Sequence, residues 1–449
     1  MTRFLLWIAG VVLLFAPGTY AAEGEWSRFR GPNGSGTSDA ATVPVKWTEK
    51  DYNWRVTLPG VGHSSPVVWG QRIFVTCGDP KTARRTVVCV SAADGRTLWR
   101  RDYSSMAYAQ HPDSGYATAT PVADADGVIV TWTTPEEVTL LALDLDGRQL
   151  WRRNLGPFVA VQGSGSSPII YGDLVVLAND QENPSLIPGH KKDPPEPIGK
   201  SSIVAVDRKT GRTRWQIDRP TAFSSLATPC VYQAEDGRPR LIFSSTLHGI
   251  TAVDPTAGKI DWELDQNFAD RCVSSPVTAP GLVIAGYGAG LRGTRYVALR
   301  PDVREKDGKP AVAYEVKKAI SLVPTPLVKD GRLFFWTDDG VVSCLRVANG
   351  DLVWCERVGG SFYSSPVCVH DRLYCIAKSG EVVVLAAADH FEVLARVPLG
   401  EQSFATPAVA GGVMYLRTRS HLFSLGGKGK SPDRSRESKI SAPIHPGQG

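Results

Sequence analysis

The residues that could do chemistry in this sequence are scattered rather than clustered. Its eight histidines are isolated along the chain, and none of them forms an HxH or HExxH pattern. Because metal-ligand pairs close in sequence are missing, the sequence predicts no metal site of that kind. It also contains neither a GxSxG nucleophile elbow nor a phosphate-binding P-loop. We therefore assign no catalytic residue from the sequence.

Two Asp-x-Asp-Gly patterns could begin calcium-binding loops. They place Asp124 before Asp126 and Asp144 before Asp146. Both lack the downstream glutamate of an EF-hand, and Asp-Gly is a preferred turn pair, so we interpret them as hairpin turns. Serines that precede proline, such as Ser65, recur along the chain, and we interpret them as structural hydroxyls rather than nucleophiles.

The elements that must position any site come from an eight-fold repeat. A Ser/Thr-Pro step opens each copy and is followed by short apolar runs separated by Gly and Asp turns, the pattern of antiparallel hairpins. The prolines are 40 to 61 residues apart, at positions 66, 121, 168, 229, 276, 326, 366 and 407. This period, with four short strands in a copy, predicts an all-β fold: an eight-bladed β-propeller of four-stranded antiparallel blades.

Each copy closes with a turn and an aromatic residue. In most copies the turn ends in glycine and a tryptophan follows within three or four residues, whereas the fifth and seventh copies carry Tyr314 and Leu394 there. One bulky aromatic residue in each repeat indicates packing between blades. The predicted seam residues are Trp54, Trp99, Trp151, Trp215, Trp262 and Trp354.

The two ends of the repeat region complement each other. The eighth copy has three strands and no closing tryptophan, whereas a strand pattern containing Trp54 precedes the first copy. A strand near Trp54 that completes the last blade would close the ring and remove the open sheet edge. We therefore place an extended N-terminal segment at 23–53, in which Trp26 to Ser38 form a loop rather than a strand, and the propeller at 54–425.

The segments outside the propeller predict an exported protein. Residues 1–22 combine one positive charge, about 12 apolar residues and a small-residue end, which is typical of a secretory signal peptide. No cysteine lies near the expected cleavage site, so we expect no lipid anchor there, and no later run is long enough to span a membrane. Residues 426–449 are rich in Gly, Ser, Pro and charge, which predicts a disordered basic tail.

Net charge and cysteine content further limit which partners and which chemistry the sequence predicts. A net charge of +5 over 449 residues does not indicate nucleic-acid binding. We expect a monomer. Export would permit disulfides, and Cys344 and Cys355 flank an Asn-Gly turn symmetrically, so a two-residue hairpin could place them opposite each other. Cys77 with Cys89, and Cys368 with Cys375, also fall on adjacent strands. Spacing alone leaves these three pairings open.

A propeller places any site at one end of its central channel. The residues three before each proline should wall this mouth, and they include His63, Thr118, Tyr363 and Phe404. Arg271 is the candidate basic residue beside them.

Three loops are unusually long and extend over 103–116, 181–200 and 287–296. Insertions in repeats are often on the binding face. The 181–200 loop carries His190, Lys191 and Lys192, which we name as a candidate contact for an envelope protein or peptide. A plain exposed insertion is the alternative.

The repeat resembles a known superfamily. Ala205 to Trp215 (AVDRKTGRTRW) and Ala252 to Trp262 (AVDPTAGKIDW) look like the tryptophan-docking motifs of pyrroloquinoline-quinone (PQQ)-like propellers. That superfamily contains quinoprotein alcohol dehydrogenases and outer-membrane assembly factors of the BamB type. The opening WSRFRGPNGSGTS, of the form WxxFRGPNGxG, further resembles a set of secreted bacterial PQQ-like repeat proteins.

The resemblance implies two different functions. The first is a binding or scaffold propeller in the periplasm or cell envelope, which needs no cofactor and is not an enzyme. The second is a dehydrogenase that uses PQQ and calcium, with an acidic base and three oxygen ligands for the metal. Many such enzymes also hold the quinone beneath a disulfide of adjacent cysteines, and no two cysteines are adjacent here. We therefore favour the binding function, and expect no cofactor.

Overall fold

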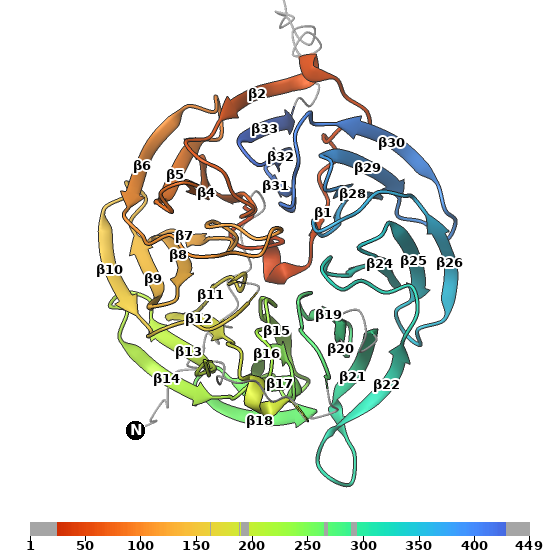
Figure 1. Ribbon diagram of the computed structural model, residues 1–449. Helices are drawn as coiled ribbons and strands as arrows, with labels where there is room; N and C mark the ends of the chain where they lie inside the picture. The colour runs from red at the N-terminus through yellow and green to blue at the C-terminus, as the bar shows by residue number, and fades with distance from the viewer. Residues whose placement is uncertain are drawn as a thin grey trace, which may run out of the picture.

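Eight antiparallel sheets form a closed ring around a central axis (Figure 1). The computed structural model describes residues 25–161, 163–187, 189, 197–264, 268–288 and 294–427. The predicted signal peptide and nearly all of the predicted tail lie outside these residues. The prediction of an all-β, eight-bladed propeller is confirmed. Across the described part of the chain, no helix has both the length and the apolar composition needed to cross a bilayer.

In blades 1 to 7 four consecutive strands follow each other from the axis to the rim, and blade 8 has three consecutive strands. Blade 1 contains β3 (Val67–Trp69), β4 (Arg72–Gly78), β5 (Arg85–Ser91) and β6 (Thr97–Tyr103); blade 2 contains β7 (Val122–Asp124), β8 (Gly127–Thr134), β9 (Glu137–Leu143) and β10 (Gln149–Asn154). Blade 3 contains β11 (Ile169–Tyr171), β12 (Leu174–Asn179), β13 (Ser202–Asp207) and β14 (Thr213–Asp218); blade 4 contains β15 (Cys230–Gln233), β16 (Pro239–Ser245), β17 (Gly249–Asp254) and β18 (Lys259–Leu264).

The second half of the ring repeats this order. Blade 5 contains β19 (Val277–Ala279), β20 (Leu282–Gly288), β21 (Thr294–Arg304) and β22 (Pro310–Val316); blade 6 contains β23 (Leu327–Lys329), β24 (Arg332–Trp336), β25 (Val341–Arg346) and β26 (Leu352–Arg357). Blade 7 contains β27 (Val367–Val369), β28 (Arg372–Ile376), β29 (Glu381–Ala386) and β30 (Val393–Pro398); blade 8 contains β31 (Ala408–Ala410), β32 (Val413–Arg417) and β33 (His421–Gly426).

The N-terminal strand β2 (Tyr52–Thr57) completes blade 8. It pairs antiparallel with β33, and Trp54 lies opposite Ser424. Strands from the two ends of the described chain therefore share one sheet, as Figure 1 shows at the red-to-blue junction. This arrangement leaves no gap in the ring, which is the reason that three C-terminal strands suffice for the last blade.

The middle strands are buried on both faces, whereas the outer strands alternate. In β5 all seven residues are buried, and in β2 half-buried and exposed residues alternate. This difference follows from stacking, because each middle strand lies between two neighbouring blades while each outer strand has one face in solvent. The core consequently consists of a series of apolar clusters between blades.

The seam aromatics join consecutive blades through hydrogen bonds as well as packing. Five of the six predicted tryptophans donate from indole Nε1 to a carbonyl oxygen of the next blade, at 2.8 to 3.0 Å: Trp54 to Ala92, Trp99 to Leu145, Trp151 to Arg208, Trp215 to Pro255 and Trp354 to Ala388. Tyr314 donates from its hydroxyl to Val347 at 2.7 Å. Trp262 instead lies 5.8 Å from the guanidinium carbon of Arg304 in blade 5.

The segment before β2 crosses the channel instead of lying beside the ring (Figure 1). The 3₁₀ turn η1 (Pro32–Gly34) lies in its middle, and a second one, η2 (Glu49–Asp51), precedes β2; a third, η3 (Pro184–Leu186), lies in blade 3. The prediction of a loop without a strand is wrong at β1 (Thr37–Ser38), which pairs parallel with β27 as a fifth strand of blade 7. Sequence periodicity missed it because the strand has two residues.

All eight cysteines are free thiols. The proposed bridge between Cys344 and Cys355 fails because the register shifts by one residue at Cys344, which pairs with Trp354, while Cys355 pairs with Ser343. Neighbouring residues of a strand point to opposite faces, so the two thiols face away from each other. In the other two candidate pairs, Cys77 lies opposite Thr86 and Cys368 lies opposite Leu373.

Candidate functional site

A cavity of about 370 Å³ lies on the propeller axis. The five predicted mouth residues all line it, together with the other residues that stand three before a proline. The full ring of these lead-in residues is His63, Thr118, Gly165, Leu226, Val273, Val323, Tyr363 and Phe404. Tyr363, Phe404 and His63 come from three consecutive blades, so one side of the wall is aromatic, whereas Leu226, Val273 and Val323 make the opposite side aliphatic.

A ring of eight hydroxyl groups lies below this wall, one residue before each proline. An extended lead-in places alternate residues on the same side, which is why the hydroxyls share the channel with the residues two positions earlier. In seven places the backbone N–H of one ring member donates to the hydroxyl oxygen of the member in the next blade, at 2.9 to 3.1 Å. The ring members are Ser65, Thr120, Ser167, Thr228, Ser275, Thr325, Ser365 and Thr406.

The N-terminal segment makes the floor of the cavity. Phe29 lines the cavity, and its two neighbours Arg28 and Arg30 are buried, at 7% and 0% exposed. Each guanidinium donates to the backbone carbonyl of a proline that follows a member of the hydroxyl ring: Arg28 to Pro229 in blade 4, and Arg30 to Pro366 in blade 7. The opening motif therefore closes one end of the channel. Sequence reasoning missed this role, although two arginines around one aromatic residue in a Gly-rich segment were the available signal.

On the aromatic side of the wall, each side chain packs against the next. The ring of His63 stacks on Phe404 with centroids 4.6 Å apart and planes 19° apart, and Tyr363 meets Phe404 edge-on at 5.2 Å. The ammonium of Lys378 lies 4.2 Å from the centroid of Tyr363. Such contacts fix the rings in place and add a cation–π attraction.

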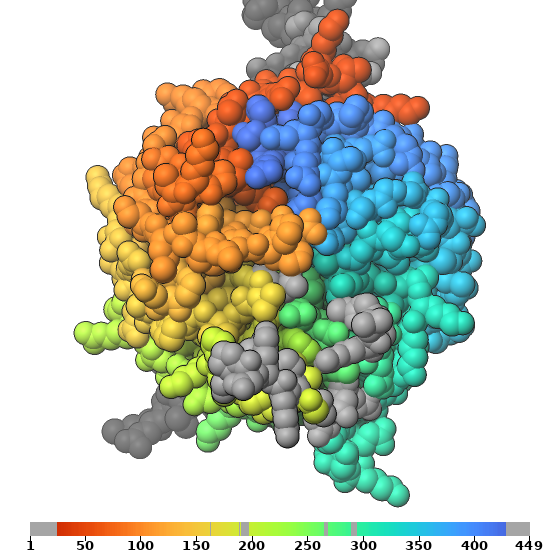
Figure 2. Space-filling model, viewed as in Figure 1, coloured from red at the N-terminus to blue at the C-terminus, as the bar shows by residue number. Residues whose placement is uncertain are grey.

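A loop between β6 and β7 closes over this side. Its Asp113 accepts hydrogen bonds from the ammonium of Lys378 at 3.0 Å and from the hydroxyl of Tyr363 at 3.2 Å. Burial alone would raise the pKa of Asp113, but these two hydrogen bonds and the charge of Lys378 outweigh it and hold the pKa below its usual value. Figure 2 shows the orange part of the chain, which contains this loop, reaching over the middle of the face.

Arg271, the predicted basic residue, lines the cavity on the opposite side. Its guanidinium donates to the carboxylate of Glu182 at 2.9 Å and lies 4.8 Å from the ring centroid of Phe223. Glu182 also accepts from Ser224 at 3.3 Å. Arg271 therefore belongs to an ion pair that joins the loop after β12 to the channel rim.

The free energy of unfolding should depend on pH through two groups, His63 and Glu401, which act in different pH ranges. Burial, followed by the charges of Arg417 and Arg419, lowers the pKa of His63 to about 4 from an ordinary value of 6.5. The unfolded chain then binds the proton first, so stability is full above pH 6.5 and falls as the pH drops towards 4. Burial alone would raise the pKa of Glu401, but hydrogen bonds from Thr418, His421 and Ser420 lower it from 4.5 to about 2. The stability that ionised Glu401 contributes is therefore lost only as the pH falls from 4.5 towards 2.

We therefore expect His63→Phe to remove most of the stability loss between pH 6.5 and 4, measured by urea unfolding at intervals of half a pH unit. The loss at lower pH should remain, because Glu401 is unchanged. His390→Asn is the matched control, since the His390 side chain is 71% exposed. An unchanged slope in the His63 variant would contradict the assignment.

The cavity does not fit a calcium-bound quinone. Such a site needs several oxygen ligands that converge on the metal. Among the residues that the structure describes, no group of three or more His, Cys, Asp or Glu side chains could hold a metal ion. Asp113, the acidic residue that lines the cavity, is engaged by Lys378, and the nearby Glu182 and Asp338 are engaged by Arg271 and by the backbone N–H groups of Leu322 and Val323. The described residues thus supply no calcium ligand set, and we derive no redox step.

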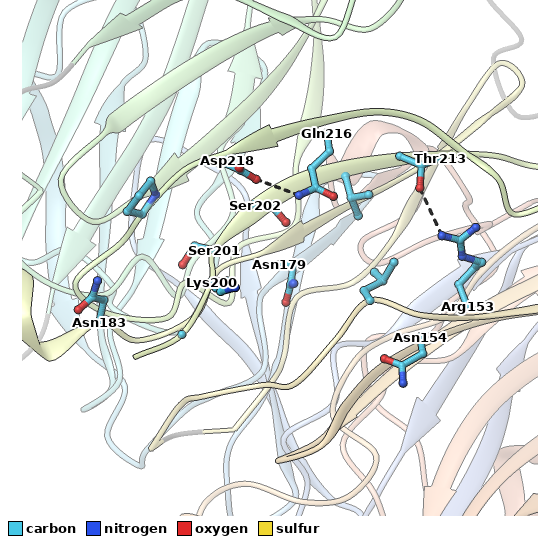
Figure 3. A pocket seen from close by; sticks show the side chains of 14 residues that line it. Arg153, Asn154, Asn179, Asn183, Lys200, Ser201, Ser202, Thr213, Gln216 and Asp218 are labelled. Atoms are coloured by element: carbon cyan, nitrogen blue, oxygen red, sulfur yellow. Dashed lines mark hydrogen bonds between the residues drawn. The ribbon is translucent and has the colours of Figure 1, made fainter. Parts of the chain in front are cut away.

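A second, polar pocket of about 530 Å³ lies between blades 2 and 3 (Figure 3). Its walls come from β10, the end of β12, β13, β14 and the segments that connect them. Two hydrogen bonds join lining residues: Gln216 donates to Asp218 on the same strand at 2.9 Å, and Arg153 of blade 2 donates to Thr213 of blade 3 at 3.5 Å. Several amide and amine donors line the pocket: Asn154, Asn179, Asn183 and Lys200.

Three exposed apolar side chains occur in segments near this pocket, although none of them lines it. Val161 is 69% exposed, Leu186 37% and Ile198 58%. Backbone hydrogen bonds hold their segments together, because Glu182 donates to Val159 at 2.8 Å and accepts from Gly199 at 2.7 Å. We call the pocket and these three residues the blade 2–3 surface. The candidate contacts His190, Lys191 and Lys192 lie outside the described residues.

Five other exposed apolar residues have a different distribution, whereas Met106 and Val303 are exposed outside this pattern. Leu98, Leu150, Ile260, Leu352 and Val393 lie on the outer strands β6, β10, β18, β26 and β30, one or two positions before the seam residue of their blade. They therefore recur with the repeat and are dispersed around the rim. The apolar residues of the blade 2–3 surface lie in loops and do not recur.

Comparison with known proteins shows what this chain is similar to. The family described as "Outer membrane protein assembly factor BamB" matches residues 51–223 and 190–354. Curated BamB proteins are 25% identical over 232 residues in Moranella endobia (48% of this chain, 56% of the relative) and 20% identical over 279 residues in Yersinia pestis (61% and 65%). This chain thus spans between half and two thirds of the length of these relatives.

Solved structures show the same fold at low sequence identity. BamB from Moraxella catarrhalis has a TM-score of 0.56 at 15% identity, covering 83% of this chain and 95% of its own. A europium-containing methanol dehydrogenase has a TM-score of 0.64 at 11% identity, covering 90% and 98%. Because the family match covers more than half of the sequence, this chain belongs to the BamB family of PQQ-like β-propellers.

Proposed function

We propose that this protein is a binding propeller of the cell envelope that acts in the assembly of outer-membrane proteins. The observation that carries the proposal is the blade 2–3 surface, where Val161, Leu186 and Ile198 are exposed beside a pocket rich in hydrogen-bond donors. Exposed apolar side chains in neighbouring segments, with polar groups beside them, are typical of protein interaction sites. The names of the curated relatives support the process, and their BamB fold supports the scaffold.

The chemistry of the surface favours a protein or peptide as partner. Amide and ammonium donors at Asn154, Asn179, Asn183 and Lys200 suit the carbonyl groups of a polypeptide backbone, and the three apolar residues suit its side chains. The partner is therefore an envelope protein or peptide. Export through residues 1–22 is part of the same proposal, because such a partner is met only outside the cytoplasm.

A genetic test compares this surface with the rim. In a strain that lacks the gene, the double variant Leu186→Glu and Ile198→Glu should fail to restore the amount of outer-membrane β-barrel proteins. Two buried charges at an interface core are poorly tolerated. The matched control is Leu150→Glu with Leu352→Glu, since both residues are exposed on the rim, and it should restore them. Full restoration by the first variant, with both variants equally abundant, would reject the surface.

The dehydrogenase alternative is tested separately. Titration of the chain that begins at Glu25 with PQQ, with and without calcium, would be followed by tryptophan fluorescence and by dye-linked alcohol oxidation. We expect neither saturable quenching nor turnover, because the described residues do not supply the calcium ligands. Calcium-dependent binding with turnover would instead support the enzyme.

A further inference from the structure

The hydroxyl ring of the axial cavity has unused donors. Seven of its members accept a backbone N–H from the neighbouring blade, and Thr228 accepts none of these bonds. Within the described residues, no hydroxyl of the ring has an acceptor for its own proton. Eight O–H groups therefore line one level of the cavity with protons free to turn inwards. Converging donors of this kind suit an anion or a carbonyl oxygen.

Two buried guanidinium groups flank the floor residue Phe29 and have no acidic partner among the described residues, although neither Arg28 nor Arg30 lines the cavity itself. Neither Arg28 nor Arg30 forms an ion pair with a carboxylate of the described chain. Three of their nitrogens, Nε of both residues and Nη1 of Arg30, are buried without a hydrogen-bond partner. The carbonyls that they contact belong to Pro229 and Pro366, each next to a ring member. Burying uncompensated cations is costly, and an anion nearby would relieve that cost.

The upper wall is apolar and suits a flat body. His63, Phe404 and Tyr363 form a packed aromatic side, and Leu226, Val273 and Val323 face them from the other blades. A volume of about 370 Å³ accommodates a small molecule and excludes a folded segment. The floor and the loop over the mouth make the cavity a dead end rather than an open pore.

We propose that the axial cavity binds a small aromatic monocarboxylate, with its carboxylate on the hydroxyl ring above Arg28 and Arg30 and its aromatic ring against His63, Phe404 and Tyr363. This goes beyond the partner-binding function, which uses the blade 2–3 surface. The polarity of the cavity determines the orientation, because hydroxyl donors lie towards the floor, with buried positive charge behind it, and apolar groups lie at the mouth. Asp113, held by Lys378 and Tyr363, then lies near the mouth and away from the carboxylate.

The test is calorimetric titration of the chain that begins at Glu25 with sodium benzoate, benzamide and inorganic phosphate. Benzoate should bind to one saturable site. Benzamide, which has the same ring without the charge, should bind at least about ten times more weakly, and phosphate should not bind because it has no apolar part. Equal binding of benzoate and benzamide, or no benzoate binding, would overturn the proposal.

Variants locate the site. Thr228→Val removes a hydroxyl that takes no part in the N–H ring, and Phe404→Leu removes part of the aromatic wall. Each should weaken benzoate binding about three- to ten-fold. Arg30→Met should weaken benzoate binding more. If this variant does not fold, the other two variants still test whether benzoate binds in this cavity. Leu150→Ala on the rim is the control and should bind as the parent protein does. Unchanged binding in Thr228→Val and Phe404→Leu would place benzoate elsewhere and reject this cavity.

Discussion

Asp180→Ala should lower the free energy of unfolding by about 3–5 kcal/mol. Asp180 accepts two hydrogen bonds from Nη2 of Arg219, both at 3.0 Å, and the two side chains are 0% and 1% exposed. Removing the carboxylate leaves the guanidinium buried without a counter-charge, which costs far more than the pair itself contributes. Asp180 lies two residues before Glu182, so its loss should also loosen the ion pair with Arg271.

A double variant separates the ion pair from simple packing. Asp180→Leu with Arg219→Met replaces both charges with apolar groups and should recover most of the stability. Urea unfolding at pH 7 measures both changes. If the double variant is as unstable as Asp180→Ala, the uncompensated charge is not the cause of the loss.

Removal of β2 should abolish the cooperative folding of the ring. A chain that begins at Leu58 lacks the fourth strand of blade 8, the floor of the cavity and the Trp54 seam, and it exposes the edge of β33. An unpaired edge next to apolar surface promotes association between chains. We expect aggregates or a broad, low-temperature unfolding transition, measured by size-exclusion chromatography and calorimetry.

The control for this truncation is the chain that begins at Glu25, which keeps every described residue before β2. It should elute as a single species and unfold in one sharp transition. A monomeric, cooperatively unfolding product from the chain that begins at Leu58 would show that β2 does not close the ring.

The sequence predicted the fold because its signals repeat. Eight Ser/Thr-Pro steps and their closing aromatics each specify the same local structure, so an error in one copy leaves the others intact. The complementary ends identified the closing strand, since Trp54 preceded a first blade that already had its own seam residue. The same repeat placed the mouth residues around the cavity, because an equivalent position in every blade faces the axis.

The unpredicted features depend on contacts between parts of the chain that the repeat does not relate. Asp113, in the loop between blades 1 and 2, meets Lys378 and Tyr363 of blade 7, and the hydrogen bonds join residues 265 and 250 positions apart. Arg28 and Arg30 are unremarkable in a polar segment until that segment crosses the channel. The Cys344 pairing failed for a local reason, a one-residue register shift that the sequence pattern does not show.

If the blade 2–3 surface binds an assembly partner, site-specific photo-crosslinking in the native envelope should capture that partner there. A photoreactive amino acid at Leu186 should give an adduct with a protein of the outer-membrane assembly machinery, identified by mass spectrometry. The same amino acid at Leu352, exposed on the rim, should give none. Adducts of equal yield from both positions, or from Leu352 alone, would show that the partner does not bind specifically at the blade 2–3 surface.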